Sequence, residues 1–178
     1  MYLSRLTQWL AIAAISVISP TLVSAVPAQA GPTELALLSN YVGEWAGAGV
    51  LEGGDAPQPF RCRLTIDKGN QARINYAGRC TLVNMNLSVS GTIAFNDASR
   101  HYEAIMTSNA GFTGLAVGRV QGENIVFALT EKEADRAGNN VRLGAGITLS
   151  GASSIVIDYQ VEFNDSGRVL TATVPFSR

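Results

Sequence analysis

The sequence has few of the residues on which most catalytic and metal sites depend. Its 178 residues include one histidine and two cysteines. A hydrolytic triad needs a nucleophile, a base and an orienting group, and one histidine without a G-x-S-x-G turn does not supply them. A zinc site needs three or four His, Cys or carboxylate ligands, and one histidine with two cysteines that are expected to be oxidised does not assemble one convincingly. We therefore expect no catalytic residues and no metal site.

Clustered charge is also scarce. The sequence has 13 basic and 14 acidic residues, together 15% of the chain, and the cations are scattered singly. Nucleic acids and anionic membrane surfaces are bound by clustered Lys and Arg, so neither is expected as a partner. Beyond residue 30, no apolar run reaches the roughly 20 residues that span a bilayer, so no membrane span is expected there.

Residues 1–30 have the three zones of a signal peptide. Met1–Gln8 carries one cation, and Trp9–Val23 is uncharged and mostly apolar. The tail ends in Ala28-Gln29-Ala30, the small-x-small pattern that signal peptidase accepts. Pro20 leaves the apolar zone too short to span a bilayer. We expect cleavage after Ala30 and export to the periplasm or the cell exterior; the alternative is an uncleaved membrane anchor.

Residues 31–178 have the pattern of one domain of short strands. Gly, Asn and Asp recur every 8–12 residues or so, with β-branched and aromatic runs between them, which is typical of an all-β sandwich or barrel. Only Pro32–Asn40 predicts a short helix, and in Thr113–Val120 neither face is clearly apolar. The expected strands are Gly43–Leu51, Pro59–Asp67, Arg73–Val83, Met85–Phe95, Arg100–Thr107, Thr113–Val120, Asn124–Glu131, Val141–Leu149, Ser154–Phe163 and Val169–Arg178.

The two cysteines flank an expected hairpin. Pairing Cys62 opposite Cys80 sets Leu64 against Gly78 and puts both cysteines on the apolar face of their strands. A register slipped by one residue would put them on opposite faces. In an exported protein this pattern predicts a disulfide, and the alternative is two buried free thiols. We expect a structural role, because a redox pair would need a C-x-x-C spacing.

The first expected strand carries a G-x-W-x-G-x-G motif, Gly43–Gly49, after the short helix. This motif resembles the opening strand of the calycin barrels, which include lipocalins and fatty-acid-binding proteins, and its extra glycines are most similar to the nitrobindin-type barrels. The resemblance implies an antiparallel up-and-down β-barrel of about 8–10 strands. It also implies that Trp45 closes one end of the barrel and that Arg178, at the end of the last strand, packs over the indole. A tryptophan in a generic β-sandwich is the alternative.

The resemblance raises haem as a possible ligand. Nitrobindin-type barrels hold haem through a histidine in their last strands, and Val169–Arg178 contains none. The one histidine, His101, shares a strand face with Glu103, which predicts a solvent-facing position. Met85 and Met106 could each lie inside the barrel, where they are expected to serve packing rather than to bind iron. We therefore expect no cofactor, with haem as the less favoured alternative.

The expected inward faces suit the binding of a small apolar molecule. They bring aliphatic and aromatic side chains with a few tyrosine hydroxyls, a composition typical of ligand pockets. Inward glycines at Gly47, Gly49, Gly78 and Gly91 are expected to leave room. The candidate ligand-binding residues of the barrel interior are Trp45, Tyr76, Phe95, Tyr102, Phe127 and Tyr159.

We therefore predict an exported barrel that binds a small apolar ligand. Two alternatives stay open. One is a barrel enzyme of the dirigent or allene-oxide-cyclase type, in which Tyr159, Tyr76 and Glu44 would be the polar groups. The other is a barrel without a cavity that acts through its outer surface, as an inhibitor or an envelope component.

Overall fold

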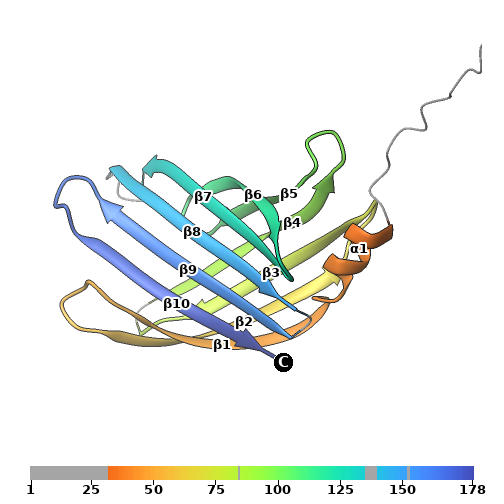
Figure 1. The fold of residues 1–178 in the computed structure, drawn as a ribbon. Helices are drawn as coiled ribbons and strands as arrows, with labels where there is room; N and C mark the ends of the chain where they lie inside the picture. Colours follow the sequence, from red (N-terminus) through yellow and green to blue (C-terminus); the bar gives the residue numbers. More distant parts are fainter. Residues whose placement is uncertain (1–31, 84, 135–139, 152) are drawn as a thin grey trace, which may run out of the picture.

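The computed structural model describes residues 32–83, 85–134, 140–151 and 153–178, so the expected signal peptide lies outside the described residues. One short helix, α1 (Pro32–Ser39), precedes ten strands (Figure 1). The strands are β1 (Gly43–Leu51), β2 (Gln58–Lys68), β3 (Arg73–Thr81), β4 (Asn86–Asn96), β5 (His101–Ser108), β6 (Thr113–Gln121), β7 (Asn124–Ala134), β8 (Asn140–Ser150), β9 (Ser154–Phe163) and β10 (Val169–Ser177).

Each strand pairs with the next one along the chain in antiparallel fashion, and β1 pairs with β10 to close the barrel (Figure 1). The sequence prediction of an all-β, antiparallel up-and-down barrel with a short N-terminal helix is confirmed. The described strands agree with the expected runs to within two residues at each end, except that β7 runs on to Ala134. Alternation of apolar and polar side chains, with turn residues between the runs, thus predicts the strands, whereas closure into a barrel was implied by the resemblance of the first strand.

The closure of the barrel depends on the glycines of the first strand. Ala46 faces Ser177 and Gly47 faces Phe176 in the β1–β10 register. A Cβ at Gly47 would lie 2.7 Å from the carbonyl oxygen of Pro175, and one at Gly49 would lie 2.9 Å from that of Thr173. A side chain at either position would push the last strand away. The glycines of the G-x-W-x-G-x-G motif therefore allow the two ends of the sheet to meet.

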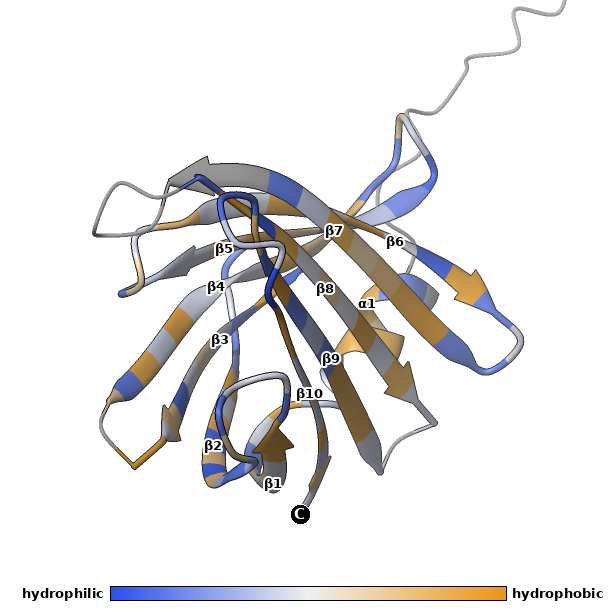
Figure 2. Cartoon of the chain, turned by 90° about the vertical axis from the view of Figure 1, so that its left-hand side faces the viewer, coloured by the Kyte–Doolittle hydropathy of each residue, from blue (hydrophilic) through white to orange (hydrophobic). Residues whose placement is uncertain are grey.

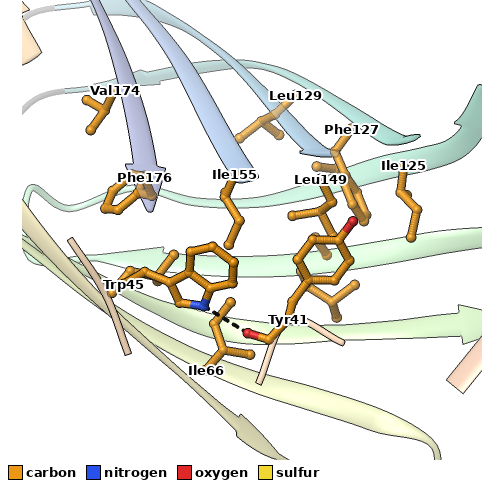
Figure 3. Close-up of a cluster of buried hydrophobic side chains, with 14 of the residues drawn as sticks. Tyr41, Trp45, Ile66, Ile125, Phe127, Leu129, Leu149, Ile155, Val174 and Phe176 are labelled. Atoms are coloured by element: carbon orange, nitrogen blue, oxygen red, sulfur yellow. Dashed lines mark hydrogen bonds between the residues drawn. The ribbon is translucent and has the colours of Figure 1, made fainter. Parts of the chain in front are cut away.

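One end of the barrel is closed by α1 (Figure 1) and by the residues that follow it, of which Tyr41 and Trp45 are drawn in Figure 3. Leu38 and Tyr41 are fully buried, and Trp45 is 2% exposed. The indole Nε1–H of Trp45 donates a hydrogen bond to the carbonyl of Tyr41 at 2.9 Å. The Arg178 guanidinium lies 4.4 Å from the centre of the Trp45 ring and donates a hydrogen bond to the carbonyl of Asn40. The C-terminus is thereby tied to the closed end.

Strand β6, whose sequence pattern was ambiguous, turns small residues inward. Gly118 is buried while Leu115 is 50% exposed. A Cβ at Gly118 would lie 2.4 Å from the ring of Phe127, and one at Gly114 would lie 2.8 Å from the side chain of Leu129. The inward face of β6 therefore lacks apolar bulk because side chains from β7 occupy the space. No count of apolar residues along β6 alone could reveal this.

The cation–π contact at the closed end should contribute to stability. Arg178→Ala should lower the free energy of unfolding by roughly 0.5–2 kcal/mol, and Trp45→Ala by about 3–5 kcal/mol because the ring is buried. Urea denaturation followed by circular dichroism measures both. Arg119→Ala, an exposed arginine on β6, is the matched control and should cost less than about 0.5 kcal/mol. Equal losses for Arg178→Ala and Arg119→Ala would show that the contact contributes nothing.

A disulfide joins Cys62 and Cys80, which face each other across β2 and β3 at a sequence separation of 18. Peptide mass mapping of the non-reduced protein should find this pair linked. Closing a loop of this length is worth about 3 kcal/mol in the chain-entropy model, so replacing both cysteines by alanine should lower the Tm by roughly 6–12 °C. Labelling of Cys62 and Cys80 by an alkylating reagent before any reduction would contradict the assignment of a disulfide.

Candidate functional site

The barrel interior holds a cavity of about 150 Å³. Its lining reaches from Ile66 and Ile155 near the closed end to Leu51, Leu82 and Leu87 at the strand ends opposite α1. Figure 2 looks into the barrel from this second end, with α1 behind. Most lining residues are aliphatic or aromatic, and none of those in the described part of the chain is charged. The cavity therefore offers a ligand contact area but no ion to pair with.

Two tyrosines supply the hydroxyl groups of the cavity. Tyr76 reaches in from β3, and its hydroxyl donates a hydrogen bond to the carbonyl of Ile105 at 3.1 Å. Tyr159 reaches in from β9, and its hydroxyl makes no hydrogen bond to any described residue. Burial removes water from both rings and raises the pKa of each phenol to about 12. Both hydroxyl groups are therefore neutral hydrogen-bond donors at physiological pH. The hydroxyl group of Tyr159 donates to no acceptor within the described chain.

The candidate interior residues divide into two groups. Tyr76 and Tyr159 line the cavity, whereas Trp45, Phe95, Tyr102 and Phe127 pack into the closed half of the barrel and do not line it. Tyr102 contacts Phe95 and Phe127 edge to face, with ring centres 5.0 and 6.4 Å apart. The period-two pattern separates inward from outward side chains, but it contains no information on depth along the barrel axis.

Several other cavity residues were not among the candidate ligand-binding residues. Phe112 lies in the turn between β5 and β6, and it is 9% exposed and lines the cavity. Met106, which was expected to serve packing, also lines it. The disulfide of Cys62 and Cys80 forms part of the wall. A turn residue such as Phe112 has no strand periodicity to follow, so its burial depends on the fold alone.

Of the four inward glycines, Gly78 lines the cavity as expected, whereas Gly47, Gly49 and Gly91 do not. A Cβ at Gly91 would lie 1.8 Å from the carbonyl oxygen of Ile105 and 2.7 Å from the hydroxyl of Tyr76. A Cβ at Gly78 would lie 3.1 Å from a methyl group of Val89. The neighbouring strand and the Tyr76 side chain therefore fill the space at Gly91, and at Gly78 the Val89 side chain leaves little room for a larger residue. Gly91 instead allows the Tyr76 hydroxyl to reach its acceptor.

The remaining candidate polar residues do not line the cavity. His101 Nε2 lies 3.2 Å from Glu103 Oε1 and 3.2 Å from Ser99 Oγ, in a polar cluster at the start of β5. Glu44 is not a cavity residue either, because its carboxylate accepts a hydrogen bond from Thr65 Oγ1 at 3.1 Å. No group of three or more potential metal ligands occurs within the described ranges. The cavity therefore contains neither a carboxylate nor an imidazole from these positions.

Residues 34–173 match the model of the THAP4-like, heme-binding beta-barrel domain. The chain belongs to this family. Its relation to the wider calycin barrels stays a prediction. A comparison of the chain with curated proteins gives no significant match.

Solved structures support the fold of the THAP4-like domain. The crystal structure of Rv2717c from M. tuberculosis is 18% identical, with a TM-score of 0.63, and the alignment covers 83% of this chain and 98% of that one. The S-type phycobiliprotein lyase CPES from Guillardia theta is 12% identical, with a TM-score of 0.54, and the alignment covers 85% and 98%. At these identities the similarity establishes the barrel architecture.

The family match corrects the expectation of no cofactor. The THAP4-like domain is described as heme-binding, so haem is the ligand indicated for the family. The donor set of this cavity does not fit a histidine-ligated haem, because among the described lining residues the iron donors are the Met106 thioether and two neutral phenols. No cation among the described lining residues is available to pair with the haem carboxylates. The family's ligand and the donors of this chain therefore disagree.

The position of His101 leads to a specific expectation for haem. In a titration of the protein with hemin, His101→Ala should leave the affinity and the Soret band unchanged within about twofold, because the imidazole does not line the cavity. Absorption spectroscopy measures both quantities. Thr113→Ala, a change of an exposed residue at the other end of the barrel, serves as the control. Loss of a Soret shift in the His101 variant alone would show that the histidine reaches the ligand.

Proposed function

We propose that this barrel binds a small, apolar, uncharged molecule in its interior cavity. The observation that carries the proposal is the lining: aliphatic and aromatic side chains, and one hydroxyl, that of Tyr159, without a partner in the described chain. An apolar cavity of about 150 Å³ in another protein stays dry and takes up benzene. Apolar walls with a few convergent polar groups are typical of binding sites for small molecules.

The electrostatics of the cavity favour a neutral ligand. A charged group in an apolar interior is unstable unless an opposite charge or several hydrogen bonds compensate it, and the described lining provides neither. The Tyr159 phenol stays protonated because burial raises its pKa to about 12. It can donate one hydrogen bond to a carbonyl, ether or hydroxyl oxygen of the ligand. The ligand class is therefore apolar with a single polar atom.

The position of the polar residues weakens the alternative of a barrel enzyme. Tyr76 and Tyr159 are in the cavity, but both are neutral, and the third candidate, Glu44, is hydrogen-bonded to Thr65 away from it. Proton transfer near neutral pH needs a group whose pKa is close to the working pH. Two phenols with a pKa of about 12 do not meet this need. Binding is therefore better supported than catalysis.

Haem is the second candidate ligand, because the family match indicates it. Hemin therefore belongs in any ligand screen. A hemin complex would require donors other than histidine in this cavity, and Met106→Ala together with Tyr159→Phe would identify them by a change in the absorption spectrum.

Binding in the cavity is tested by filling it. The fluorescent probe N-phenyl-1-naphthylamine should brighten on entering the barrel, and decanol should displace it at least tenfold better than decanoate. Ala145→Phe, a lining position on β8, should weaken probe binding more than tenfold by taking up volume. Ala128→Phe, an exposed position on the adjacent strand β7, is the matched control and should bind as the unaltered protein does. Equal probe binding by both variants would locate the site outside the cavity.

We propose that the mature protein is exported. Two observations support this: the three zones of residues 1–30, and the disulfide, since disulfides persist in oxidising compartments. N-terminal sequencing of the protein recovered from the periplasm or the medium should begin at Gly31. A species that starts at Met1 and stays in the cytoplasm would contradict the proposal.

A further inference from the structure

The outer wall of the barrel gathers three arginines that are dispersed along the sequence, so the scattered cations that argued against an anionic membrane surface are clustered by the fold. In the β2–β3 register Arg63 faces Arg79, and Arg61 faces Thr81 on the same outer side. All three arginines are exposed, and none forms an ion pair within the described chain. Like charges directly opposite each other on two strands destabilise the sheet. The arrangement therefore has a stability cost that an anionic partner would remove.

A polar hollow adjoins this cluster. It is lined by Arg79 together with the hydroxyl-bearing residues Ser88, Ser90 and Thr107 on β4 and β5. Ala77 and Gly78, which have little or no side chain, also line the hollow. Guanidinium and hydroxyl groups in one recess are suited to bind a phosphate or a polyol. The cluster and the hollow form one continuous basic and polar face, which we call the arginine face.

The turn that follows β3 carries exposed apolar side chains. Val83 is 70% exposed and Met85 is 53% exposed, although large apolar side chains are usually covered. The flanking residues Leu82 and Leu87 line the cavity. This turn lies at the end of the barrel opposite α1 and has hydrophobic colour in Figure 2. An apolar path therefore runs from the tip of the turn into the cavity.

The arginine face and the apolar turn are neighbours on one hairpin. Arg79 precedes Val83 by four residues, which at about 3.4 Å per strand residue is roughly 14 Å. When the apolar tip enters the acyl region of a bilayer, guanidinium groups at this distance come within about a Debye length of the lipid headgroups. The distance between the apolar tip and the arginines therefore matches the distance between the acyl region and the headgroup region of a membrane.

We propose that this corner of the barrel, made of Arg61, Arg63, Arg79, Val83 and Met85, docks on an anionic lipid surface. Docking of this corner would bring the end of the cavity that lies opposite α1 close to the membrane surface and would shorten the path of an apolar ligand between membrane and barrel. The docking surface stands on the charge and exposure of these side chains; only the transfer of a ligand rests on the function proposed above. An acidic protein would also pair with the arginines, but it would not explain an exposed apolar tip that continues into the cavity lining.

Vesicle binding tests the docking surface. The chain from Gly31 onward contains α1 and all ten strands. It should co-sediment with vesicles of phosphatidylcholine and phosphatidylglycerol at low salt, and far less with phosphatidylcholine alone. Arg61, Arg63 and Arg79 together changed to Gln should lower the partition coefficient about a hundredfold, at roughly fivefold per arginine. Val83→Ser with Met85→Ser should lower it about tenfold while keeping the preference for anionic lipid.

Matched controls come from the opposite end of the barrel. Arg119 and Val120 are both exposed at the end of β6, near α1. Arg119→Gln and Val120→Ser should bind vesicles as the unaltered protein does. The proposal is overturned if binding does not depend on anionic lipid, or if the control variants lose as much binding as the variants of the corner. It is also overturned if the arginine variants bind unchanged, or if only an acidic protein binds the arginine face.

Probe binding separates this proposal from the proposed function. N-phenyl-1-naphthylamine binding in free solution should be unaltered by the arginine substitutions, since none of these residues lines the cavity. Transfer of the probe from anionic vesicles to the barrel should slow by the same factor as vesicle binding falls. Vesicle binding without probe binding would keep the docking surface and reject the ligand site; probe binding without vesicle binding would do the reverse.

Discussion

The pairing of the first strand with the last is the constraint on which the rest of this structure depends. A sheet of ten strands has two edges unless it closes. Closure here requires backbone contact at Gly47, where a side chain would collide with Pro175. Once the sheet is closed, its inward faces share one interior, and Trp45, Tyr41 and Leu38 seal one end. The cavity is what the remaining side chains leave open.

The interior combines a packed half and a hollow half. Near α1, aromatic rings from several strands meet and pack edge to face, as Tyr102 does with Phe95 and Phe127. The cavity lining beyond this cluster includes the small residues Ala145 and Ala172. Small side chains at these two positions leave space that the larger lining side chains do not fill. The packed half provides stability and the hollow half provides the site.

The sequence predicted most of the fold because strand periodicity is a local signal. The apolar face of β9 follows from alternation within one run. The register of β2 and β3 follows from setting Cys62 opposite Cys80 with both on the apolar face. Three features escaped prediction because they depend on the closed barrel. The first feature is the position of each aromatic ring along the barrel axis, and the second is the burial of Phe112 in a turn. The third is the pairing of Arg63 with Arg79 across β2 and β3. Each is a relation between strands that no single run encodes.

In this barrel, the arrangement of the strands and the side chains that contact a ligand are independent of each other. Ten strands and a plugged end place side chains around a common space, but the ligand is chosen by the few groups that reach it. In this chain those groups are Tyr76, Tyr159 and Met106, without a charge or an imidazole among the described lining residues. A haem site depends on one or two donors at defined positions, so it can be lost or replaced while the fold persists. The donor set, rather than the strand order, therefore determines which ligand this member of the family holds.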